Sequence, residues 1–110
     1  MNLNYTCDKL DAAVQTLKEG TNEPRFRLAN AYLSQLRELK AEDFPVELRA
    51  DFKRVIDEMA KMAPSGNEDA LKSSMERVRP EKVDDLTKQI CLLQERTQVI
   101  RHEDDSRTLQ

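Results

Sequence analysis

The sequence predicts an all-α protein, a compact bundle of about five helices with a central antiparallel hairpin and a long C-terminal helix. Helix-forming residues dominate, and the 110 residues include only two glycines and no tryptophan. No segment alternates apolar and polar residues over a useful length, which argues against β-strands. Prolines punctuate the chain at intervals of about twenty residues, as helix boundaries do. They are Pro24, Pro45, Pro64 and Pro80.

Three helices are expected in the first part of the chain, over residues 4–19, 24–41 and 45–62. In each segment the apolar residues recur at alternating spacings of three and four, which places them on one helical face. Pro24 and Pro45 fall in first turns, where the missing N–H costs no hydrogen bond. The short connection between the second and third segments predicts the antiparallel hairpin, with Phe44 filling the space beneath it.

Two further helices are expected, a short one over 67–78 and a long one over 80–102. We expect residues 1–102 to form a single domain, which is the usual outcome for a chain of this length, and 103–110 to form a polar, frayed tail. The predicted core draws on every segment. Its members are Leu10, Val14, Leu17, Phe26, Leu33, Leu36, Phe44, Leu48, Phe52, Val55, Ile56, Met59, Leu71, Met75, Ile90 and Leu93.

Charge and composition favour some classes of partner over others. Charged residues make up 35% of the chain, the formal net charge is −3, and no basic block is present. A protein that binds nucleic acid mainly through phosphates normally presents a basic face, so the charge pattern argues against nucleic-acid binding. Cys7 and Cys91 are too few for a disulfide scaffold. Together with the lack of a long apolar run, they favour a cytoplasmic protein that does not bind membranes.

The residues that carry common enzyme chemistry are sparse. His102 is the single histidine, and it has no metal-ligand spacing to either cysteine. Cys91 and His102 lie about 16 Å apart along one expected helix, beyond hydrogen-bond reach. The two glycines are too far apart to form a phosphate-binding loop, and adjacent acidic residues on a helix point in different directions. The sequence therefore predicts no catalytic residues, metal, cofactor or small-molecule ligand.

The last expected helix carries more apolar surface than one stripe requires. Its main stripe consists of Val83, Leu86, Ile90, Leu93, Thr97 and Ile100. Leu92 and Val99 lie on nearly the opposite side of the same helix. Either another helix of the bundle covers these two residues, or they are exposed and contact another chain.

The second alternative gives the functional hypothesis. It is a non-enzymatic protein–protein interaction module, a small adaptor or regulator that forms homodimers through Leu92, Val99, Cys91 and Arg96. The competing hypothesis is a nucleic-acid-associated regulator with a helix-turn-helix-like corner near residues 77–82. Its contacts would be Arg77, Arg79 and Lys82.

Overall fold

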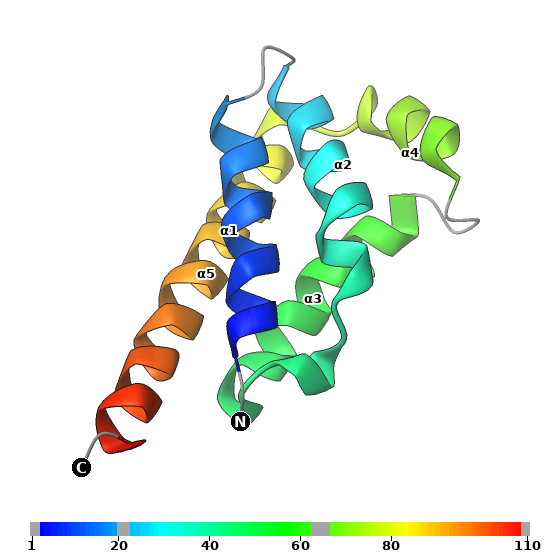
Figure 1. The fold of residues 1–110 in the computed structure, drawn as a ribbon. Helices are drawn as coiled ribbons and strands as arrows, with labels where there is room; N and C mark the ends of the chain where they lie inside the picture. Colours follow the sequence, from blue (N-terminus) through cyan, green and yellow to red (C-terminus); the bar gives the residue numbers. More distant parts are fainter. Residues whose placement is uncertain (1–2, 20–22, 63–66, 109–110) are drawn as a thin grey trace.

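The computed structural model describes residues 3–19, 23–62 and 67–108, and every regular element in these ranges is helical (Figure 1). This confirms the all-α prediction. The elements are α1 (Asn4–Glu19), α2 (Pro24–Ser34), η1 (Leu36–Glu38), η2 (Ala41–Asp43), α3 (Val46–Met62), α4 (Glu68–Met75) and α5 (Pro80–Thr108), where η denotes a short 3₁₀ helix.

The second helix is shorter than the expected 24–41 and ends at Ser34. The rest of that segment forms η1 and η2, which carry the chain across the base of the bundle. Asp43 stabilises this path through two hydrogen bonds. Its carboxylate accepts the Lys40 backbone N–H at 2.8 Å, and its carbonyl accepts the Thr6 hydroxyl at 2.7 Å. These bonds compete with a continued α-helix, and tertiary contacts here override helix propensity.

The last helix is longer than the expected 80–102, since it continues to Thr108. The segment 103–110, expected to be a frayed tail, is therefore helical over 103–108. Residues 103–108 contain neither glycine nor proline, so nothing in their sequence ends the helix. A helix of 29 residues is about 43 Å long, which accounts for most of the 51 Å length of the molecule.

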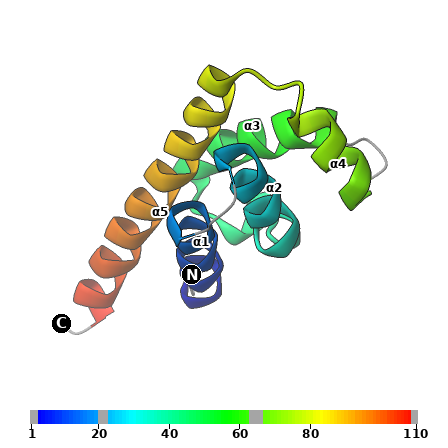
Figure 2. The same cartoon turned by 90° about the horizontal axis from the view of Figure 1, so that it is seen from above.

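The contacts between helices centre on α1 and α5. α1 packs against α2 on one side and α5 on the other, while α3 packs most closely against α5 (Figures 1 and 2). The chain reverses direction between α2 and α3, but these helices contact each other less than either contacts its other neighbours. The expected central hairpin is therefore not closely packed, because η1 and η2 separate α2 from α3. α4 lies at the far end, against α2 and α3.

One hydrophobic core connects the five helices. Phe44 is fully buried beneath α3, as predicted, and its ring stacks on Phe52 with 4.4 Å between the ring centroids. Three residues predicted to be core, Phe26, Leu33 and Ile56, are only half-buried, and the other thirteen are buried. The prediction omitted several fully buried residues. These include Cys7, Leu28, Ala29, Ala31, Leu86 and Thr97.

Ion pairs on the surface give a pH dependence of stability. Hydrogen bonding and charge from Lys82, at 3.1 Å, hold the pKa of Glu58 below its ordinary value of 4.5, and Lys61 adds to this effect. Lys9 lowers the pKa of Glu38, and Lys72 lowers the pKa of Glu68, in the same way. A carboxylate whose pKa is lowered by folding contributes stability above its unfolded pKa. That contribution disappears as the pH falls through the folded pKa.

We therefore expect Glu58→Gln to lower stability at pH 7, and this loss to shrink as the pH falls through the lowered pKa of Glu58. Urea midpoints measured from pH 7 to pH 3 would test this. Lys82→Gln should reduce the same pH-dependent difference, because it removes the principal partner of Glu58. An equal loss for Glu58→Gln at both pH values would contradict the prediction, since the effect would not depend on the charge.

Candidate functional site

Polar side chains hold α5 between α1 and α3. Asp11 on α1 accepts hydrogen bonds from the side-chain amides of Gln94, at 2.9 Å, and Gln98, at 2.8 Å. On the other flank, Arg96 donates to Asp51 of α3 at 2.8 Å. Between these flanks the apolar stripe of α5 enters the core, with Val83, Leu86, Ile90, Leu93 and Thr97 buried. The opposite side of α5 is left at the edge of the bundle (Figure 2).

Leu92 and Val99 lie on this free side of α5. Their exposed fractions are 54% and 57%, and the helix is continuous through both. α1 packs on α5 but does not cover them, so of the two alternatives raised by the sequence the structure supports exposure. They are seven positions apart in the sequence, which is about two helical turns and places one above the other.

Charged and polar side chains border these two aliphatic residues on both sides, and all of them are exposed. Helical spacing places Lys88, Glu95 and His102 on the side toward α1, which we call the α1-side edge. Asp85, Arg96 and Glu103 lie on the side toward α3, which we call the α3-side edge. We refer to the two aliphatic residues and the two edges together as the α5 outer face.

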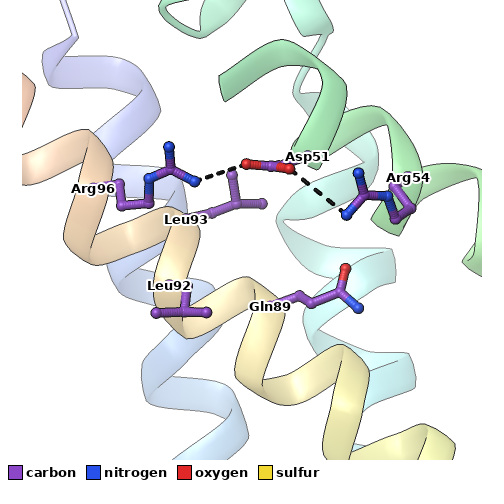
Figure 3. Close-up of a pocket in the computed structure, with 6 residues that line it drawn as sticks. All are labelled: Asp51, Arg54, Gln89, Leu92, Leu93 and Arg96. Carbon is purple, nitrogen blue, oxygen red and sulfur yellow. Dashed lines mark hydrogen bonds and ion pairs between the residues drawn. The ribbon is translucent and has the colours of Figure 1, made fainter. Parts of the chain in front are cut away.

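A shallow hollow of about 170 Å³ lies beside Leu92, between α5 and α3. Asp51 sits between the guanidinium groups of Arg96 and Arg54, at 2.8 and 3.7 Å (Figure 3). This pairing fixes Arg96 along the flank of the hollow. A guanidinium has five N–H donors, so Arg96 keeps donors for a further acceptor.

The structure brings together three of the four residues predicted to form an interface. Leu92, Arg96 and Val99 share the α5 outer face, whereas Cys91 is half-buried and packs against the core. Cys7 and Cys91 form no disulfide. Sequence reasoning missed the other charged residues of the face, although their helical spacing to Leu92 and Val99 is visible in the sequence. The bonds of Asp11 and Asp51 to α5 span 45 to 87 positions and carry no local signal.

The corner proposed for nucleic-acid contact carries mixed charge. Lys82 is paired with Glu58, whereas Arg77 and Arg79 are exposed at the link between α4 and α5. The exposed acids Glu76 and Glu81 lie beside them in the sequence. The corner thus offers a weaker positive field than its basic residues alone would give.

Within residues 3–19, 23–62 and 67–108, no three residues among the histidine, cysteine and acidic side chains gather closely enough to hold a metal ion. None of the described helices combines the length and apolar character needed to cross a bilayer. Comparison with protein-family models, curated proteins and solved structures found no match to this chain.

Proposed function

We propose that the protein is a non-enzymatic interaction module, a small cytoplasmic adaptor or regulator that self-associates through the α5 outer face. The observation that supports this most is the exposure of Leu92 and Val99 on one side of an unbroken helix. Ordinary amphipathic helices of a bundle place such residues toward the core. The mixed charges around them favour a second copy as the partner, because a face with both signs can complement itself.

The energetics indicate a weak, reversible association. About half of each aliphatic side chain is already covered, so burying the rest contributes roughly 2–3 kcal/mol per chain. A two-fold axis uses the face twice and brings this to about 5 kcal/mol. Association itself costs about 4–15 kcal/mol in lost translational and rotational freedom. The charged edges must therefore contribute, and we expect dimers at high rather than low protein concentration.

Replacing both Leu92 and Val99 with aspartate should give a folded protein that stays monomeric at every concentration. The two positions are exposed, so the new carboxylates remain hydrated in the monomer, but they would be buried without partners in a dimer. Light scattering or sedimentation equilibrium over a range of concentrations measures association. Circular dichroism and urea unfolding confirm that the fold is kept.

A matched control substitutes aspartate for exposed residues elsewhere. Val46 on α3 is 72% exposed and distant from α5 in sequence, so Val46→Asp should leave association unchanged. A wild-type protein that is monomeric at all concentrations would contradict the proposal. Equal association of the wild type and the double variant would contradict it as well.

A further inference from the structure

We propose that two copies of α5 pair in parallel and in register, about a two-fold axis that runs along the helices. This pairing rests on the self-association proposed above. In this arrangement Leu92 meets Leu92 of the second copy, and Val99 meets Val99. Both aliphatic residues of each chain are then buried at once. The proposal fixes the orientation of the partner, which self-association alone leaves open.

The charges of the two edges favour the parallel orientation. A two-fold axis along the helices brings the α1-side edge of one chain against the α3-side edge of the other, at the same height. From the N-terminal end, the α1-side edge presents Lys88, Glu95 and His102. The facing α3-side edge presents Asp85, Arg96 and Glu103. Glu95 faces Arg96, and a histidine N–H of His102 faces the Glu103 carboxylate. Asp85 lies seven residues before Leu92, so the same register places it opposite its own copy, with Lys88 of each chain one turn away to offset the repulsion.

An antiparallel pairing does not satisfy the same residues. There the two-fold axis is perpendicular to the helices, so each edge meets its own copy. The register that joins Leu92 to Val99 of the other chain also brings Glu95 next to Glu95, and Arg96 next to Arg96. Like charges at such positions oppose association. A register that joins Leu92 to Leu92 instead avoids these contacts, but it places Val99 opposite Asp85 and leaves one aliphatic residue unpaired.

Arg96 links this pairing to the bundle. Its bond to Asp51 at 2.8 Å orients the guanidinium before any partner arrives, so less side-chain freedom is lost when Glu95 of the second copy binds. The Arg96 side chain is still 53% exposed, which leaves its remaining donors accessible. Through Asp51, α3 therefore orients Arg96 on the α3-side edge, although the aliphatic contacts come from α5 alone.

Single cysteine substitutions distinguish the orientations. In a Cys91→Ala background, Leu92→Cys and Val99→Cys should each form disulfide-linked dimers under mild oxidation, because each position faces its own copy. A disulfide requires Cα atoms within about 7 Å. Antiparallel registers can bring at most one of the two positions next to its own copy, since 92 and 99 are about 10 Å apart along the axis. Ser73→Cys, exposed on α4, is the matched control and should form no disulfide-linked dimer, because position 73 lies outside the α5 outer face.

Charge reversal gives an independent measurement. Lys88→Glu and Asp85→Lys should each weaken association, whereas an equimolar mixture of the two variants should associate more strongly than either alone. Only the mixed parallel pair places opposite charges at both contacts.

If the wild type dimerises but the two cysteine variants do not both cross-link, the parallel geometry is overturned and self-association stands. If the wild type stays monomeric, both proposals fail.

Discussion

Phe44→Ala should lower the free energy of unfolding by about 3–5 kcal/mol, the largest loss that we expect from a single substitution in this protein. Phe44 is fully buried, and its ring stacks on Phe52 at 4.4 Å where the chain enters α3. Alanine would remove this contact and leave a cavity at the base of the bundle. Domains of this size are stable by about 5–15 kcal/mol, so the variant should be close to unfolding at room temperature.

Urea denaturation followed by circular dichroism would measure this loss. Val46→Ala is the matched control, because Val46 lies two residues away but is 72% exposed, and its truncation should change the midpoint little. A small effect of Phe44→Ala would mean that the base of the bundle collapses around the smaller side chain. The stacking on Phe52 would then contribute little to holding η2 and α3 together.

The same substitution at two buried threonines should have opposite effects on stability. The Thr97 hydroxyl is buried with no hydrogen-bond partner among the described residues, whereas the Thr6 hydroxyl donates to the Asp43 carbonyl at 2.7 Å. Thr97→Val should therefore raise the free energy of unfolding by about 1–2 kcal/mol, because it removes an unsatisfied polar group. Thr6→Val should lower it by about the same amount, because it deprives a carbonyl of its donor.

Each threonine variant serves as the control for the other. Valine has nearly the same shape and the same β-branching, so packing and helix propensity change equally at both sites. Thermal or urea unfolding of the two variants measures the difference in sign. If Thr97→Val is also destabilising, its hydroxyl is bonded in solution, with the Leu93 carbonyl one turn earlier as the nearest acceptor in sequence.

The sequence predicted most of the helical architecture, because a periodic apolar pattern reports directly on which residues face the core. The first helix was predicted with the bounds found, and the third and fourth within a few residues. The second helix was wrong beyond Ser34, where the chain instead forms η1 and η2 and receives a hydrogen bond from Thr6, 37 positions away from Asp43. The predicted end of the last helix, at residue 102, was wrong as well. Residues 103–108 are polar, which suggested a frayed tail, but they contain no residue that ends a helix.

The candidate site was predicted only in part. Helical spacing alone separates Leu92 and Val99 from the core stripe, but it does not tell whether a neighbouring helix covers them. That depends on where α1 and α3 lie, which is set by Asp11, Asp51 and the burial of the whole stripe. Cys91 lies between the core stripe and the α5 outer face and is half-buried, so its part in an interface stays a prediction. The orientation of the partner stays a prediction.

The pairing of α1 with α5 has a consequence for how the chain folds. Asp11 and Gln98 are 87 positions apart, so the bonds that secure the final helix close a loop that includes almost every other element. Closing so long a loop costs more entropy than forming a local hairpin, and non-local contacts slow folding. This helical protein should therefore reach its native state more slowly than bundles whose sequential helices are nearest neighbours, and its first and last helices should dock late and together.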